Sequence, residues 1–148
     1  MLKGLPPILS PDLLKALCEM GHSDRLIIAD GNFPAHSIGK NGVVISMDGH
    51  GVPELLEAIL HVFPLDTYVD RPVTLMEKVP GDPAKTPVWD QITGIVSEKD
   101  SRGARAVGFL ERVQFYQEAK TAYLVIATSE QALYGNVMLQ KGVVADFC

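Results

Sequence analysis

The hydrophobic positions of the chain follow helix-like spacing first and strand-like spacing after it. Ser10-Pro11 is typical of a helix start, because serine caps free backbone amides and proline suits the first helical position. Apolar residues then recur at helical spacing up to Met20, and Gly21 can close a helix in the left-handed conformation. The pattern therefore predicts a first helix that ends near Gly21.

Short apolar runs bounded by turn residues follow this helix. Residues 25–29 contain Leu-Ile-Ile-Ala, a continuous run typical of a strand covered on both faces. Further strands are predicted at 43–47, 73–79, 106–110, 123–127 and 137–139, and further helices at 53–63, 86–96 and 114–121. This alternation predicts one α/β domain over residues 1–148, built as three α/β/α layers around a largely parallel central sheet.

Length and charge narrow the class of protein. A chain of 148 residues has the usual size of one domain, and its net charge of −5 argues against a nucleic-acid partner. No apolar run approaches the length of a membrane span, and the first residues lack the apolar core of a signal peptide. Cys18 and Cys148 form no Cys-x-x-Cys pair. We therefore expect a cytoplasmic protein without a membrane partner.

Several common motifs are missing from the sequence. It contains no glycine-rich dinucleotide fingerprint, no phosphate loop and no Gly-x-Ser-x-Gly elbow, which argues against nucleotide binding, phosphoryl transfer and serine hydrolysis. His22, His36 and His50 are spaced 14 residues apart, an interval that matches no metal-ligand pattern. No metal site is predicted, and the roles of His36 and His50 stay open.

Two polar residues flank the predicted strand at 25–29. His22 follows a helix end, where the helix dipole favours a protonated imidazole, so it is a candidate proton donor. Capping of the last helical carbonyls is the alternative role for His22. Asp30 follows the strand, where α/β sheets place ligands, and an Asx-type turn before Gly31-Asn32 is the alternative there. An imidazole and a carboxylate in these places suit acid–base chemistry on a small polar molecule.

The rest of the chain adds weaker candidates. Arg112 and Tyr116 are four residues apart and share a face of the predicted helix. Tyr134-Gly135-Asn136 offers hydroxyl and amide groups suited to sugar hydroxyls, although the triplet alone is an ordinary turn. Asp66 is predicted to cap a turn after the second helix.

Taken together, several blocks of the sequence resemble the L-fucose mutarotase and D-ribose pyranase family, RbsD/FucU. The blocks are Leu9-Ser10-Pro11-Asp12-Leu13-Leu14, Met20-Gly21-His22, Ala29-Asp30, Asn32-Phe33-Pro34-Ala35, Pro64-Leu65-Asp66-Thr67-Tyr68, Arg112, Phe115-Tyr116, Leu133-Tyr134-Gly135-Asn136 and Lys141-Gly142-Val143. They occur in the expected order over nearly the whole chain. Phe115–Ala119 and the Tyr-Gly-Asn triplet resemble the fucose mutarotase branch, and Thr86–Trp89 resembles its animal-type members.

The resemblance implies an isomerase that interconverts the α and β anomers of L-fucose, without cofactor or metal, with D-ribose as a further candidate substrate. It also implies a homo-oligomer. In this interpretation His22 is the general acid and Tyr116 its catalytic partner. The positions expected to bind the sugar are Asp30, Asp66, Arg112, Tyr134 and Asn136. In the family, the segments that match residues 37–50 and 80–105 are variable, so no role is assigned to residues there by resemblance. The alternative function is a non-catalytic monosaccharide-binding module on the same fold.

Overall fold

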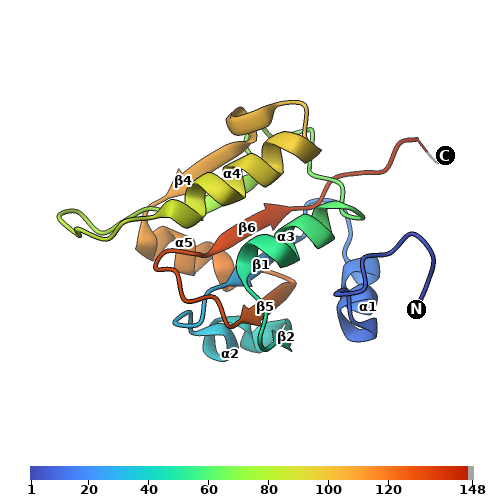
Figure 1. Ribbon diagram of the computed structural model, residues 1–148, viewed down its shortest axis with the longest axis horizontal. Coiled ribbons are helices and arrows are strands. Elements are labelled where there is room, and N and C mark those ends of the chain that lie inside the picture. Colours follow the sequence, from blue (N-terminus) through green and yellow to red (C-terminus); the bar gives the residue numbers. More distant parts are fainter. Residues whose placement is uncertain (147–148) are drawn as a thin grey trace.

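A computed structural model, which describes residues 1–146, contains one sheet of six strands in the order β2-β5-β1-β6-β3-β4 (Figure 1). The strands are β1 (Arg25–Ala29), β2 (Val43–Met47), β3 (Val73–Met76), β4 (Val107–Leu110), β5 (Leu124–Thr128) and β6 (Val137–Gln140). The α-helices are α1 (Pro11–Glu19), α2 (Ala35–Ile38), α3 (Val52–Leu60), α4 (Pro87–Lys99) and α5 (Arg112–Ala119), with 3-10 turns η1 (Gly39–Asn41) and η2 (Gly103–Ala106). Cys148 lies outside the described residues.

The sheet is largely parallel, as predicted. The pairs β1–β5, β2–β5 and β3–β4 are parallel, whereas β6 runs antiparallel to both of its neighbours, β1 and β3. The register pairs Ile28 of β1 with Val137 of β6. The carboxyl end of β1 therefore lies beside the amino end of β6, and this juxtaposition builds one end of the candidate site.

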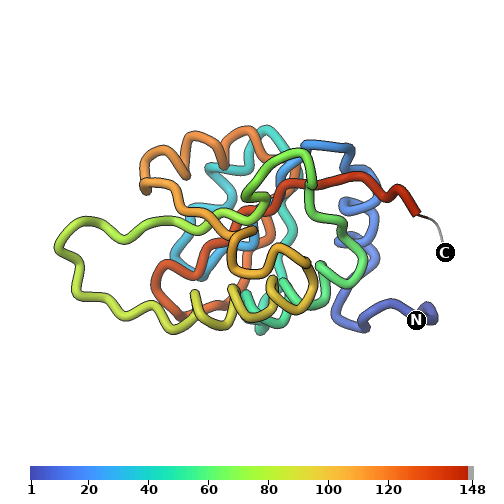
Figure 2. Tube along the Cα trace, turned by 90° about the horizontal axis from the view of Figure 1, so that it is seen from above, coloured from blue at the N-terminus to red at the C-terminus, as the bar shows by residue number. Residues whose placement is uncertain are grey.

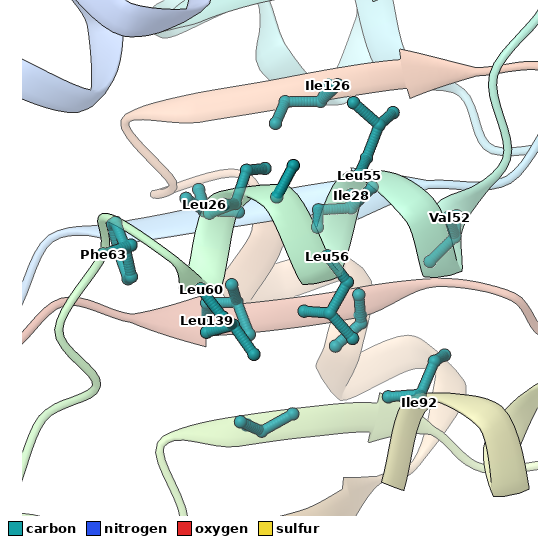
Figure 3. Packing of buried hydrophobic residues seen from close by; sticks show 14 of the residues in the cluster. Leu26, Ile28, Val52, Leu55, Leu56, Leu60, Phe63, Ile92, Ile126 and Leu139 are labelled. Atoms are coloured by element: carbon teal, nitrogen blue, oxygen red, sulfur yellow. The ribbon is translucent and has the colours of Figure 1, made fainter. Parts of the chain in front are cut away.

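The central strands β1, β5 and β6 are largely buried and helices cover both faces of the sheet, which confirms the three-layer prediction. Along β1, Leu26 and Ile28 enter a core covered by α1, α3 and α4, and Ile27 and Ala29 enter a second core covered by α2 and α5. Figure 3 shows side chains of the first core between α3 and the sheet. Each fully buried leucine or isoleucine contributes about 1.5–3 kcal/mol relative to an exposed one. The two cores therefore fix the position of β1 and of the residues at its ends.

Some boundaries differ from the sequence prediction. The first helix ends at Glu19 with an extended Met20, so the prediction of a left-handed Gly21 is wrong, and Ser23 has the positive φ of 70° instead. A hydrogen bond from the Gly21 amide to Asp24 shapes this turn. The short helix α2 was not predicted; no side chain caps its start, which leaves little local signal.

The strand β3 ends three residues before the predicted end, and residues 77–86 extend from the sheet as a long segment that leads into α4 (Figures 1 and 2). Pro80 and Gly81 turn this segment: the Asp82 amide donates to the Val79 carbonyl, and Gly81 has a φ of 84°. Proline followed by a glycine with positive φ is the signature of a type II turn.

None of the helices in residues 1–146 is long and apolar enough to cross a membrane.

Candidate functional site

A pocket of about 180 Å³ opens at the carboxyl end of β1. Five of the predicted site residues line it, and they come from three separate stretches of the chain: Asp30, Arg112, Tyr116, Tyr134 and Asn136. The volume is below the roughly 300–1,000 Å³ of sites for drug-sized ligands, so the pocket suits a smaller molecule.

Asp30 and Asn136 hold each other at the floor of this pocket. The Asp30 amide donates to Asn136 Oδ1 over 2.8 Å, and Asn136 Nδ2 donates to Asp30 Oδ2 over 3.0 Å. The amides of Asn32 and Gly135 also donate to the Asp30 carboxylate. The Asx-type turn considered for Asp30 is therefore present, and the same carboxylate lines the pocket.

The environment changes the acidity of Asp30. Its exposed fraction is 6%, and this burial raises the pKa of its carboxyl above the ordinary value of 3.8, although the hydrogen bonds from Asn32 and Gly135 oppose the rise. Asp30 is thus a better proton acceptor than an exposed aspartate. Two acceptor oxygens at this position suit a ligand that carries hydroxyl groups.

Tyr116 and Arg112 reach the pocket from α5. Glu111 caps this helix by accepting hydrogen bonds from the amides of Val113 and Gln114. The Tyr116 ring lies against Phe33, with ring centroids 5.6 Å apart. Within residues 1–146, neither the Tyr116 hydroxyl nor the Arg112 guanidinium hydrogen-bonds to another protein group, so both can bind a ligand. The four-residue spacing noted in the sequence brings these two side chains to one pocket.

The pocket also contains residues that the sequence did not single out as site residues. Phe33, Met76 and Leu133 give it an apolar side, and Asp82 enters from the 77–86 segment. Phe33 belongs to the Asn32-Phe33-Pro34-Ala35 block that resembles the family, so the sequence did contain a signal for its place in the site. Asp82 lies within residues 80–105, for which the resemblance assigns no roles, and no local sequence pattern indicates that it belongs to a site.

The other two predicted site residues, His22 and Asp66, form a separate cluster beyond the amino end of β1. His22 Nε2 lies 3.2 Å from Asp66 Oδ1. Asp66 also accepts from the Tyr68 amide and from Gln140 Nε2, which satisfies a carboxylate that is only 1% exposed. The His22 side chain remains 44% exposed, so it can reach a ligand outside this cluster.

These contacts define the roles open to Asp66 and His22. Burial acts to raise the pKa of Asp66, but the hydrogen bonds from Tyr68, Gln140 and His22 outweigh it and lower the pKa below 3.8. Asp66 is therefore an anion that can accept a hydrogen bond from the Nε2–H of His22, which leaves Nδ1 for proton exchange. The capping role considered for His22 is not the one found: within residues 1–146 its ring hydrogen-bonds to Asp66 and not to the carbonyls of α1.

The pocket and the His22 cluster lie at opposite ends of β1. Arg25 and Ala29 are four steps apart along β1, which at about 3.3 Å per residue amounts to about 13 Å. A monosaccharide ring is shorter than this, and each hydrogen bond adds only about 3 Å. A single copy of the chain therefore has two separate clusters of predicted site residues, which we call half-sites, at opposite ends of β1.

His36 and His50 do not line the pocket, and neither hydrogen-bonds to His22 or Asp66 within residues 1–146. His36 is exposed on α2, and His50 is next to Glu54, with Nδ1 3.1 Å from Oε1. Within residues 1–146, no group of three or more histidine, cysteine, aspartate or glutamate side chains is arranged to hold a metal ion.

A small pocket with carboxylate, amide, phenol and guanidinium groups beside an apolar wall is typical of a site for a monosaccharide-sized, hydroxyl-rich ligand. The fold and the pocket thus define an α/β protein with a small-molecule site at a strand end.

Comparisons with known proteins agree with this class. The family model described as the RbsD / FucU transport protein family matches residues 3–144. Human fucose mutarotase is 50% identical over 148 residues, which cover 97% of this chain and 95% of the human protein. The chain belongs to the RbsD/FucU family.

Two solved structures match over nearly their full length. FucU from Bifidobacterium longum superposes with a TM-score of 0.94 at 65% identity, covering 96% of this chain and 99% of that one. The fucose mutarotase from Streptococcus pneumoniae, solved in complex with L-fucose, superposes with a TM-score of 0.89 at 41% identity, covering 97% and 100%. These comparisons confirm the resemblance to the RbsD/FucU family, including the resemblance to its animal-type members.

Proposed function

We propose that this protein is an aldose mutarotase that interconverts the α and β anomers of L-fucose. The observation that carries the proposal is the continuous similarity to fucose mutarotases, 50% identity over 97% of the chain, together with a pocket whose groups suit a monosaccharide. The exposed, free thiol of Cys18 fits a reducing compartment, so we place the enzyme in the cytosol.

Mutarotation needs two proton transfers and no redox step. One group donates a proton to the ring oxygen while another removes the proton of the anomeric hydroxyl, and the bond between C1 and the ring oxygen breaks. The open aldehyde rotates about its C1–C2 bond and recloses by the reverse transfers. Two positioned proton carriers therefore suffice, and general acid–base catalysis typically supplies about 10²–10⁴-fold.

The residues divide between binding and proton transfer. Asp30 accepts hydrogen bonds from sugar hydroxyls, and Arg112 donates to sugar oxygens. Tyr116, whose hydroxyl makes no protein hydrogen bond within residues 1–146, exchanges the proton of the anomeric hydroxyl. Phe33, Met76 and Leu133 form an apolar wall that suits the C6 methyl group of a 6-deoxy sugar.

His22 is the general acid, and we propose that it comes from a second copy of the chain. The two residues flank β1, which spans about 13 Å from Arg25 to Ala29, more than the width of a monosaccharide ring. An oligomer can bring the His22 cluster of one subunit to the pocket of another. Asp66 then acts as a positioning residue for His22 rather than as a sugar ligand, because its side chain is only 1% exposed and it does not line the pocket. The active form is a homo-oligomer.

Saturation-transfer NMR on equilibrated L-fucose tests the activity. We expect faster magnetisation exchange between the two anomeric protons when the protein is added at catalytic concentration. D-Ribose, measured in the same way, tests the second candidate sugar. Fucose binding in calorimetry without faster exchange would favour the non-catalytic binding module instead.

Mixing two inactive variants tests the shared site. His22→Ala and Tyr116→Phe each disable a different half-site, so each homo-oligomer is expected to be inactive. After subunits exchange, some interfaces combine an intact His22 with an intact Tyr116, and part of the anomer-exchange activity should return. A mixture that stays inactive, although mass spectrometry detects mixed oligomers, would place both residues in one subunit's site.

A further inference from the structure

The 77–86 segment is attached to the pocket through the hydroxyl of Tyr134. This hydroxyl donates to Asp82 Oδ2 over 2.5 Å, and its oxygen accepts from the Val79 amide over 3.2 Å. Both partners lie on the segment that extends from β3 to α4, and Asp82 itself lines the pocket. No catalytic or binding role has been assigned above to Asp82.

The segment holds Asp82 in a defined orientation. Its other oxygen, Oδ1, accepts from the Ala84 amide over 2.8 Å, so both carboxylate oxygens are used. The type II turn at Pro80-Gly81 closes with a hydrogen bond from the Asp82 amide to the Val79 carbonyl. The two groups that contact the Tyr134 hydroxyl are therefore fixed relative to each other by a short, proline-containing turn.

The backbone of Tyr134 is held as well. Its φ is 58°, a left-handed conformation that is costly for a residue other than glycine and persists only where contacts impose it. The Trp89 indole, on α4 just after the segment, donates to the Tyr134 carbonyl over 3.0 Å. One continuous stretch of the chain thus holds Tyr134 at both ends, at a turn beside Asp30 and Asn136.

We propose, on the basis of the mutarotase function above, that Asp82 is a positioning residue that orients Tyr134 for sugar binding. Because the hydroxyl proton of Tyr134 is donated to a carboxylate, the tyrosine presents an oxygen lone pair to the sugar rather than a proton. It therefore accepts a hydrogen bond from a sugar hydroxyl and is excluded as the acid of the reaction.

The charges around the pair support this division of roles. The hydrogen bond to Asp82 raises the pKa of the Tyr134 hydroxyl, and the same bond lowers the pKa of Asp82. Asp82 thus stays an anion and Tyr134 a neutral phenol over the physiological range. Tyr116, without such a partner within residues 1–146, is left as the phenol in the pocket that can transfer a proton.

A double-mutant cycle on the oligomer tests the proposal. The initial rate of anomer equilibration of freshly dissolved L-fucose is followed by polarimetry over a range of sugar concentrations. The proteins are wild type, Asp82→Ala, Tyr134→Phe and the double variant. We expect Asp82→Ala to raise KM about 10-fold with a smaller change in kcat, because a charge-assisted hydrogen bond that orients a sugar ligand is lost. In the Tyr134→Phe background, the same replacement should change KM no further.

The controls distinguish a loss of Tyr134 positioning from unfolding of the variant and from a general effect of removing a charge in the 77–86 segment. Lys85→Ala, an exposed position in the same segment, should keep the wild-type KM. Trp89 is the only tryptophan, so its fluorescence reports on the Tyr134 turn, and an unchanged thermal midpoint excludes unfolding. If Asp82→Ala does not fold, Asp82→Asn, which keeps the shape and one acceptor oxygen, replaces it in the cycle.

Each outcome decides the proposal. A KM within twofold of wild type for Asp82→Ala, or effects of the two replacements that multiply independently, would overturn it. The wild-type protein in the same series tests the proposed function separately, because an inactive wild type contradicts the mutarotase activity. In that case the same cycle is measured as fucose affinity through Trp89 fluorescence, with the same expected non-additivity.

Discussion

Replacement of His22 by alanine is expected to slow anomer exchange by about 10²–10⁴-fold, the usual contribution of a general acid. The proton donor to the ring oxygen is lost, whereas the pocket around Asp30 is at the other end of β1 and remains intact. The measurement is saturation-transfer NMR on L-fucose at equal protein concentrations. L-Fucose affinity, measured by calorimetry, should change much less than the exchange rate.

The fold of this variant should survive, which keeps the result interpretable. The His22 side chain is 44% exposed, and Asp66 keeps its hydrogen bonds from Tyr68 and Gln140. His36→Ala is the matched control, since His36 is exposed on α2 and outside both half-sites. Exchange at the wild-type rate in folded His22→Ala would remove His22 from the mechanism.

Asp30→Asn is expected to abolish measurable mutarotation and to lower the free energy of unfolding by about 1–3 kcal/mol. Both oxygens of Asp30 accept hydrogen bonds from N–H donors, one from Asn32 and the other from Gly135 and Asn136. An asparagine side chain must turn its own amide nitrogen toward one of these donors, whichever way it is oriented. A buried donor then lacks its acceptor, and the pocket loses the negative charge of Asp30.

The two effects of Asp30→Asn are measured separately. Urea unfolding gives the change in stability, and calorimetry with L-fucose gives the change in affinity under conditions where the variant is folded. Asp48→Asn is a suitable control because Asp48 is exposed after β2. A variant with wild-type stability and wild-type fucose affinity would falsify the proposed role of Asp30.

Much of the fold was predictable because local patterns and burial agree. The bounds of β1 and β2 match the prediction, since each is a short apolar run bounded by turn residues, and β1 is also buried on both faces. The early end of β3 was not predictable, because the predicted strand runs on to Val79, whereas within residues 1–146 β4 pairs with β3 only as far as Met76 and β6 only as far as Leu75. The antiparallel direction of β6 could not be predicted either, since its apolar run of three residues, Val137–Leu139, has the same pattern in either direction.

For the candidate site too, part was predictable from the sequence and part was not. By itself the sequence predicted which side chains would carry the chemistry: the histidine before β1, the aspartate after it, the Arg112–Tyr116 pair on one helix face and the Tyr134–Asn136 turn. It also placed His22 and Asp30 at opposite ends of a strand. Whether Asp66 would join His22 or Asp30 was open, because the answer depends on the register that sets Gln140 beside Arg25 and Val137 beside Ile28.

Only the tertiary structure decided how these groups are combined. It brought Asn136 to Asp30 and Asp66 to His22, and so separated the predicted site into two half-sites about 13 Å apart along β1. It also brought Asp82 to Tyr134, a contact between residues 52 positions apart in the chain. Such contacts depend on strand order, register and loop path, which arise from the packing of the whole chain and leave no trace in local spacing.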